Sequence, residues 1–176
     1  MNPKFLQKSY NTTIQNPALS KYFKTIQILQ NDSNTKYYYH GTIALVSESI
    51  EPSKSKFLAD KKVVMATDSM TLAILFTARW GLEDFELESR TNFGGISNFV
   101  LKEVRPDALE EKLGVSGYVY YLPSDKFKQT KVGSKQLLWG HGFISMSPVK
   151  IIKKIIVNNV LEELMSRNDI KIVKYG

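Results

Sequence analysis

Chemistry in this sequence is concentrated in the tetrapeptide Tyr39-His40-Gly41-Thr42, which follows two further tyrosines. His40 is one of only two histidines, and an imidazole can hydrogen-bond a sugar hydroxyl. The glycine after it has no Cβ, so main-chain N–H and C=O groups can approach a flat amide closely. These features suit the nicotinamide ribose of a dinucleotide, and they predict that the tetrapeptide forms the floor of such a pocket. A turn histidine after an aromatic strand is the alternative interpretation.

Two further segments contribute aromatic and basic side chains. The apolar run 63–66 leads into a helical pattern, and a strand that runs into a helix forms a corner where an aromatic side chain can cover a bound ring. Phe76 is the candidate for this role, and an ordinary place in the core is the alternative. The third segment, Trp139 to Ser145, enters a strand through two glycines that flank His141. His141 is interpreted as a turn residue or, alternatively, as a functional group.

The elements that must position these segments are many strands and few helices. Strands are predicted at 37–39, 63–66, 98–104, 117–122, 142–146 and 170–173. Helices are predicted at 17–29, at 106–113 and at 159–167, and a further helix is predicted to run to about residue 79 from an N-cap at Thr67 or Asp68. The stretch 51–60 is predicted to be a loop, 83–95 a mobile loop or a hairpin and 123–127 a turn, whereas 149–157 fits a helix and a strand equally. Mixed strand order with few helices favours an α+β fold over a doubly wound parallel sheet.

Length and composition indicate one domain with an appendage. The chain has 176 residues, which fits a single domain of 36–176 preceded by a polar N-terminal extension, 1–35, that carries the helix predicted at 17–29. Without cysteine there is no disulfide scaffold, cysteine-ligated zinc or cysteine nucleophile. Two histidines without an acidic cluster predict no metal site.

Net charge and hydropathy indicate which classes of partner and which cellular compartment to expect. The net charge is +7, from 24 basic and 17 acidic residues, and the lysines are scattered, which favours general solubility over a dedicated polyanion site. No apolar run approaches the roughly 20 residues that cross a bilayer, so no membrane association is predicted. The first ten residues lack the apolar stretch of a secretory signal, which predicts a cytoplasmic or other intracellular location.

A series of short motifs resembles a known family. The motifs are Tyr39-His40-Gly41, Ala66-Thr67-Asp68 with Ala73 and Phe76, the run from Leu113 to Tyr120, Leu122-Pro123 with Asp125, Phe143-Ile144-Ser145, and Pro148-Val149. In order and spacing they resemble the ADP-ribosyltransferase-like superfamily in its diphtheria-toxin and poly(ADP-ribose) polymerase branch. The resemblance is closest to uncharacterised bacterial and phage-type members and covers about residues 37–175.

The resemblance implies a fold, a substrate and a set of binding residues. The expected fold is an α+β, ADP-ribosyltransferase-like split sheet, mixed or antiparallel, with short flanking helices. NAD is the expected substrate, without a metal, and His40 is the expected catalytic residue, binding the nicotinamide or adenosine ribose. The Gly41 backbone would hold the carboxamide, Thr42 would support His40, and Ala66 belongs to the same NAD site. Phe76 would stack on the nicotinamide ring where the family more often has tyrosine.

One departure from the family pattern bears on catalysis. Aligning Phe143-Ile144-Ser145 with the family's aromatic-aliphatic-serine motif places Gly142 where the family has its catalytic glutamate. A carboxylate set against developing positive charge commonly supplies several kcal/mol of transition-state stabilisation, and glycine supplies none of it. Either the protein is inactive, or His141 or substrate groups substitute, or a carboxylate comes from elsewhere. The candidate carboxylates are Glu83, Glu86, Glu88 and Glu103.

Three functional hypotheses follow. The first is an NAD-dependent mono-ADP-ribosyltransferase that transfers ADP-ribose to a protein, a nucleic acid or a small molecule and releases nicotinamide. The second is an inactive member that binds NAD or ADP-ribose, or that serves as a protein-interaction module. The third is a basic nucleic-acid-binding protein, for which the lysines between 126 and 135 and the cluster Lys150, Lys153 and Lys154 are the candidate contacts. The sequence predicts neither the acceptor nor the oligomeric state.

Overall fold

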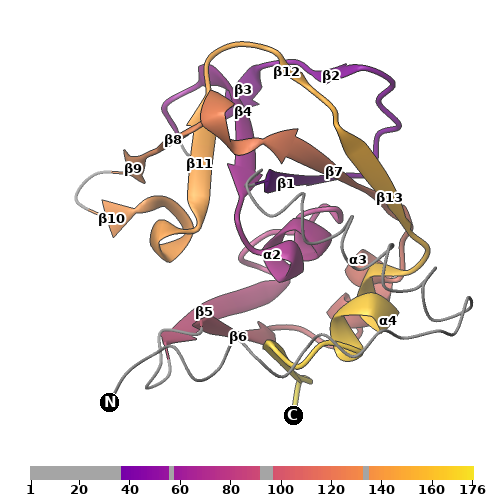
Figure 1. Cartoon of the computed structure of the whole chain (residues 1–176). Coiled ribbons are helices and arrows are strands. Elements are labelled where there is room, and N and C mark those ends of the chain that lie inside the picture. Colours follow the sequence, from indigo (N-terminus) through magenta and orange to yellow (C-terminus); the bar gives the residue numbers. More distant parts are fainter. Residues whose placement is uncertain (1–36, 56–57, 92–96, 133–134) are drawn as a thin grey trace, which may run out of the picture. The chain divides into compact units, whose positions relative to one another are not determined.

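A β-rich unit extends from Lys36 to Gly176 in the computed structural model, which describes residues 37–55, 58–91, 97–132 and 135–176 (Figure 1). The predicted N-terminal extension and its helix at 17–29 lie outside the described residues. No helix within the described ranges has the length and apolar character needed to cross a bilayer.

The largest sheet has seven strands, and every pairing in it is antiparallel. Its order is β13-β7-β1-β4-β11-β8, and β3 pairs with β4 outside this path. The strands are β1 (Tyr37–Thr42), β3 (Ser53–Ser55), β4 (Lys61–Thr67), β7 (Gly117–Pro123), β8 (Lys128–Gln129), β11 (Gly142–Ser145) and β13 (Lys153–Val157). The strand β3 corrects the prediction of a loop throughout 51–60.

A second, three-stranded sheet contains β5 (Phe85–Thr91), β6 (Ser97–Glu103) and β14 (Ile170–Val173). β5 and β6 form an antiparallel pair, so residues 85–91 of the stretch 83–95, predicted to be a mobile loop or a hairpin, form a paired strand. β14 lies parallel to β6. Two short ladders complete the strands: β2 (Ser49–Ile50) pairs with β12 (Val149–Lys150), and β9 (Lys131–Val132) pairs with β10 (Lys135–Gln136). The ambiguous stretch 149–157 is therefore extended, in β12 and β13.

Three short α-helices occur in the described part of the chain: α2 (Met70–Leu75), α3 (Ala108–Leu113) and α4 (Val160–Met165). The helix predicted from residue 67 or 68 to 79 is much shorter and starts later, because Thr67 still belongs to β4. Its N-cap is Ser69, whose hydroxyl accepts the Leu72 N–H at 3.3 Å. Two 3-10 turns, η3 (Ser124–Lys126) and η4 (Leu137–Gly140), connect strands. The α+β class is confirmed, with mostly antiparallel sheets.

The described residues form two clusters of buried apolar side chains. The first joins α2 to α3, α4 and the second sheet, and in Figure 1 α2 lies between β1 and the β5–β6 pair. Residues 71–75 of α2 are all buried, as expected of a helix packed on every side. The second cluster contains Tyr38, which stacks on Phe143 with ring centroids 4.0 Å apart. The first cluster matters for the site because its packing holds α2 close to β1.

Candidate functional site

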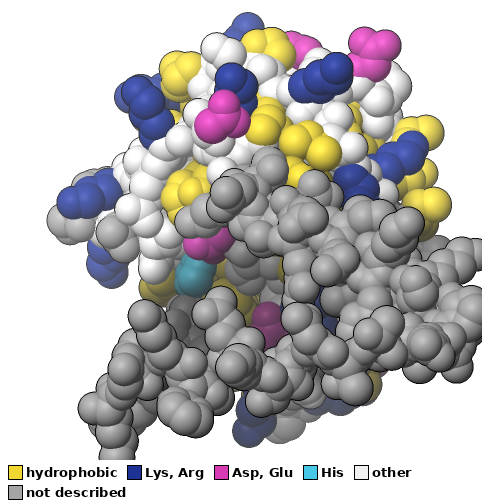
Figure 2. Space-filling view, in the orientation of Figure 1, with side chains coloured by type: hydrophobic (Ala, Val, Ile, Leu, Met, Phe, Trp, Pro, Cys, Tyr) yellow, Lys and Arg dark blue, Asp and Glu magenta, His cyan; other side chains and the backbone are white. Residues whose placement is uncertain are grey.

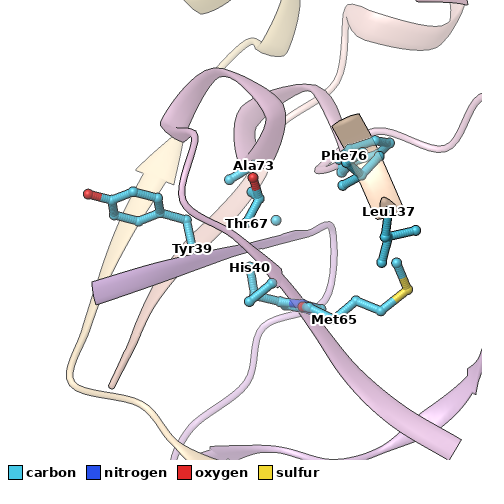
Figure 3. Close-up of a pocket in the computed structure, with 10 residues that line it drawn as sticks. Tyr39, His40, Met65, Thr67, Ala73, Phe76 and Leu137 are labelled. Carbon is cyan, nitrogen blue, oxygen red and sulfur yellow. The ribbon is translucent and has the colours of Figure 1, made fainter. Parts of the chain in front are cut away.

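A cavity of about 200 Å³ opens where β1, β4, α2 and η4 meet (Figure 3). Its lining is almost entirely apolar and consists of Tyr39, His40, Gly41, Met65, Ala66, Thr67, Ala73, Phe76, Leu137 and Leu138. In Figure 3, His40 and Met65 lie side by side, Phe76 and Leu137 stand on one side, and the Tyr39 ring points away from them. Segments from three distant parts of the sequence thus form one pocket.

The pocket exists because β1 and β4 separate. They pair only at Tyr39 and Thr67, after which β1 continues beside β7 as far as Thr42. Where β4 is no longer paired with β1, the main-chain carbonyl of Met65 has no partner on β1. A carbonyl shielded from water needs a hydrogen-bond donor. His40 supplies it, since its Nδ1 lies 2.7 Å from the Met65 oxygen. An imidazole therefore replaces a missing ladder hydrogen bond at the point where the sheet splits.

The same hydrogen bond sets the chemistry of His40. A carbonyl oxygen only accepts, so Nδ1 carries the proton and Nε2 of the neutral ring is an acceptor. Burial lowers the pKa of His40 below its ordinary value, although the hydrogen bond to Met65 opposes this shift. His40 is thus held as a neutral, oriented imidazole that can accept a hydrogen bond from a hydroxyl group.

Gly41 is explained by helix packing. A Cβ at this position would lie 1.8 Å from the Ala73 carbonyl oxygen and 2.9 Å from the Thr77 nitrogen. No side chain fits between β1 and α2 at this point, so glycine is required there before any ligand is considered. The close approach also brings Ala73 and, one turn on, Phe76 to the pocket.

Phe76 contributes a ring whose position is fixed by a neighbour. It stacks on Trp80 with centroids 5.8 Å apart and planes inclined by 10°. The Trp80 Nε1–H in turn donates to the Leu75 carbonyl at 3.2 Å. A ring braced in this way is suited to offset stacking on a planar ligand.

Four of the five residues expected at an NAD site line this pocket: His40, Gly41, Ala66 and Phe76. The fifth, Thr42, is not part of the lining. Its hydroxyl accepts the Ala44 N–H at 3.1 Å, and no hydrogen bond to His40 is seen. Thr42 therefore shapes the turn after β1.

Gly142 lies beside the pocket without lining it. It is buried and pairs with Thr67 across β11 and β4. A Cβ at residue 142 would lie 2.5 Å from Leu137 Cγ, so the Leu137 side chain fills the space into which a larger residue would project. Leu137 begins η4, where Leu138 and Trp139 both have positive φ, 51° and 56°. For non-glycine residues this conformation is strained.

The four glutamates considered as substitutes are not in the lining of this pocket. Glu86 and Glu88 form ion pairs with Lys102. Glu103 accepts main-chain N–H groups of Leu109 and Tyr175, 2.9 and 2.8 Å away.

The carboxylate next to the pocket is Asp68, which directly follows the lining residue Thr67 and pairs with His141 Nδ1 at 2.6 Å. Sequence reasoning treated Asp68 as a possible helix cap and did not connect it with His141. Met65, Thr67, Leu137 and Leu138 were also missed as lining residues, and the only sequence signal for the leucines was an apolar pair just before Trp139-Gly140.

The lysines proposed for nucleic-acid contact do not share one face. Lys153 and Lys154 are neighbours on β13, so their side chains point to opposite sides of the sheet. Lys153 lies over the Tyr121 ring and Lys154 over the Tyr118 ring, at 5.2 and 5.8 Å. On the face in Figure 2, Lys and Arg side chains are separated by other residues. No group of three or more His, Asp or Glu residues in the described ranges could hold a metal ion.

A scan against protein-family models, a search of curated proteins and a search of solved structures each returned no match.

Proposed function

We propose that this chain is an ADP-ribosyltransferase-like protein that binds NAD with the nicotinamide ring in the β1–β4–α2 pocket and transfers ADP-ribose to an acceptor. The observation that carries the proposal is the convergence of His40, Gly41 and Phe76 on one apolar cavity. All three residues also belong to the series of motifs that carries the resemblance in the sequence. The separation of β1 and β4 beside His40 agrees with the split sheet expected of this family.

The size and chemistry of the cavity fit one ring. Sites for drug-sized ligands usually measure roughly 300–1,000 Å³, so about 200 Å³ suits nicotinamide, with the rest of the dinucleotide outside. Phe76 offers a braced π face for the ring. The His40 Nε2 offers an acceptor for a ribose hydroxyl, because Nδ1 is already used by Met65.

The second hypothesis, an inactive nucleotide-binding member, is favoured by one observation. Leu137 fills the space beside Gly142, so an apolar group stands where the family has a carboxylate. Such a protein would bind NAD or ADP-ribose and leave the glycosidic bond intact. The two hypotheses agree on binding and differ on nicotinamide release.

Calorimetric titration of the full chain with NAD, ADP-ribose and nicotinamide tests binding. Phe76→Leu keeps an apolar side chain but removes the π face, so nicotinamide affinity should fall about two- to tenfold. His40→Ala removes the ribose acceptor and should weaken NAD more than nicotinamide. The matched control is Phe127→Leu, which alters a buried ring in the second cluster and should leave both affinities unchanged.

Release of labelled nicotinamide, measured with the same samples, separates the hypotheses. Binding with release that His40→Ala abolishes supports the transferase. Binding without release supports the inactive member. If the folded wild-type chain binds neither NAD nor nicotinamide, both hypotheses are wrong.

A further inference from the structure

A row of side chains leads away from the pocket across three strands of the large sheet. Tyr39 of β1 lines the pocket, and in Figure 3 its ring points away from His40. The sheet register places Tyr121 of β7 opposite Tyr39 and Lys153 of β13 opposite Tyr121. Adjacent strands lie about 4.8 Å apart, so the main chain at Lys153 lies about 10 Å from Tyr39. Tyr39, Tyr121 and Lys153 are called the tyrosine–lysine row below.

The tyrosine–lysine row lies on the face of the sheet that α2 covers. Two residues along the same strands are Gly41, Val119 and Ile155, and the last two pack in or against the first core cluster. Side chains two residues apart on a strand point to the same face. Tyr121 is only half-buried, and Lys153 is exposed. Within one row, this face therefore changes from a core under α2 to an accessible surface of aromatic and cationic groups.

The tyrosine rings are arranged so that a further flat group can stack on them. Tyr39 meets Tyr121 at an interplanar angle of 87° with centroids 5.0 Å apart, and Tyr37 meets Tyr121 at 68° and 6.1 Å. A T-shaped contact uses the edge of one ring, so ring faces remain for stacking. None of these three hydroxyl groups forms a hydrogen bond within the described part of the chain, so each is available to a ligand.

Lys153 supplies a positive charge that no described carboxylate neutralises. Its ammonium group lies 5.2 Å from the centroid of the Tyr121 ring and, unlike that of Lys174, forms no ion pair with a described acid. The pKa of Tyr39 is raised first by burial and then by the charges of Tyr121 and Asp68, so its hydroxyl stays protonated at neutral pH. A cation beside neutral aromatic rings favours a ligand that carries both phosphate and an aromatic base.

We infer that the tyrosine–lysine row binds the adenosine diphosphate half of the dinucleotide, with the diphosphate at Lys153 and the adenine against the rings of Tyr37 and Tyr121. This inference rests on the proposed function, which places nicotinamide in the pocket. A cavity of about 200 Å³ holds one ring, so the diphosphate and the adenosine must lie outside it. The row is continuous with the pocket, because Tyr39 belongs to both.

Calorimetric titration of the full chain with ADP and with nicotinamide tests the two halves of the site separately. Tyr121→Leu removes a π face and should weaken ADP binding about five- to 100-fold. Tyr121→Phe keeps the ring, so its ADP affinity should stay within about threefold of the wild type. Lys153→Met should weaken ADP binding about two- to fivefold, and this loss should shrink at high salt, because salt screens exposed charges. All three variants should bind nicotinamide as the wild type does.

The opposite face of the sheet provides matched controls. There Lys154 lies over the Tyr118 ring at 5.8 Å, and Tyr118 packs against the second cluster, outside the lining of the pocket. The same combination of lysine and ring is thus present without the connection to the pocket. Tyr118→Leu and Lys154→Met should leave ADP affinity unchanged. Urea denaturation of each variant establishes that folded proteins are being compared.

The outcomes separate this inference from the proposed function. ADP binding that is no weaker in Tyr121→Leu than in Tyr118→Leu overturns the inference, as does nicotinamide binding without ADP binding, and both results leave the proposed function standing. If the wild type binds neither nicotinamide nor NAD but binds ADP through Tyr121 and Lys153, the proposed function is wrong and the row is supported as a nucleotide site. Absence of binding by every ligand overturns both.

Discussion

The pocket has two walls that are built in different ways. One, the strand–helix wall, consists of residues 39–41 of β1, 65–67 of β4, and Ala73 and Phe76 of α2 and its C-cap. The other, the turn wall, is formed by Leu137 and Leu138 of the turn η4, in which the consecutive residues Leu138 and Trp139 have positive φ. The first is held by ladder hydrogen bonds and a buried helix, and the second by a strained turn.

In the proposed function, the difference separates binding from chemistry. The residues of the strand–helix wall are placed by strands and by α2 with its C-cap, so this wall would receive the ring without rearrangement of the backbone. The turn wall leads into His141 and Gly142, where the Asp68–His141 pair lies and where the proposed relatives have a carboxylate. Strained backbone tends to occur at functional sites, because packing must hold it in place. We therefore expect the two walls to respond differently to the same kinds of substitution.

The largest expected effect is on the strand–helix wall. Gly41→Ala places a Cβ 1.8 Å from the Ala73 carbonyl oxygen, and a buried helix backbone cannot move without disturbing the first core cluster. The free energy of unfolding should fall by about 3 kcal/mol or more, as in severe overpacking. Urea denaturation measures it, with Gly176→Ala as control because nothing lies within 4 Å of a Cβ at that position. A loss below 1 kcal/mol would contradict the close approach of α2 to β1.

A glycine-to-alanine substitution at residue 142, beside the turn wall, should lower stability less than Gly41→Ala does. A second substitution, Leu137→Ala, should offset part of that loss. The three atoms nearest to a Cβ at residue 142 belong to the Leu137 side chain, whereas those nearest to a Cβ at residue 41 are main-chain atoms of Ala73 and Thr77, so we expect a smaller loss of about 1–2 kcal/mol for Gly142→Ala. In the double variant with Leu137→Ala, the two effects should be less than additive by at least about 1 kcal/mol, because the removed atoms are those in conflict. Additive losses in urea denaturation would show that Leu137 does not occupy this space.

The strain of the turn wall predicts a stabilising substitution. Trp139→Gly removes the cost of a left-handed conformation at a residue that is 48% exposed, and stability should rise by about 0.5–1 kcal/mol. Asp107→Gly also relieves a positive φ, of 61°, outside the pocket. Its gain should be smaller, because aspartate tolerates this region better than tryptophan. Thermal unfolding measures the change in stability of both variants. Equal gains would contradict the expectation that the turn wall is more strained than another position with positive φ.

A final effect is confined to acid pH. Because burial lowers the pKa of His40, the unfolded chain binds its proton more readily than the folded chain does. The contribution of neutral His40 to stability is present above its ordinary pKa of about 6.5 and is lost as pH falls below that value towards the lowered folded pKa. Between pH 7.5 and 5.5, His40→Gln should therefore lose less stability than the wild type. Identical pH profiles in urea denaturation would show that His40 titrates as if exposed.

The sequence predicted the strand–helix wall well because its signals are local. Consecutive tyrosines predicted β1, the apolar run 63–66 predicted β4, and the spacing of Ala73 and Phe76 placed both on one helix. The helix boundaries were less accurate, since Ser69 competes with Thr67 and Asp68 as a cap and only the extent of β4 decides among them.

Other features depended on contacts between distant residues. The stretch 149–157 fits two periodicities, and its strands are fixed by pairing with Ile50 in β2 and with β7. The hydrogen bond from His40 to the Met65 carbonyl arises only because β1 and β4 separate. The Asp68–His141 pair joins residues that are 73 positions apart, and no local sequence pattern predicts such a contact.

By itself the sequence determined which groups are available for chemistry: two histidines, no cysteine, a glycine after His40 and a glycine at position 142. It also determined the α+β class, because strand and helix periodicities are properties of short segments. The tertiary structure alone decided that Gly41 makes room for α2, that Leu137 fills the space beside Gly142, and that Asp68 meets His141. These are matters of packing and register between strands, which local sequence does not encode.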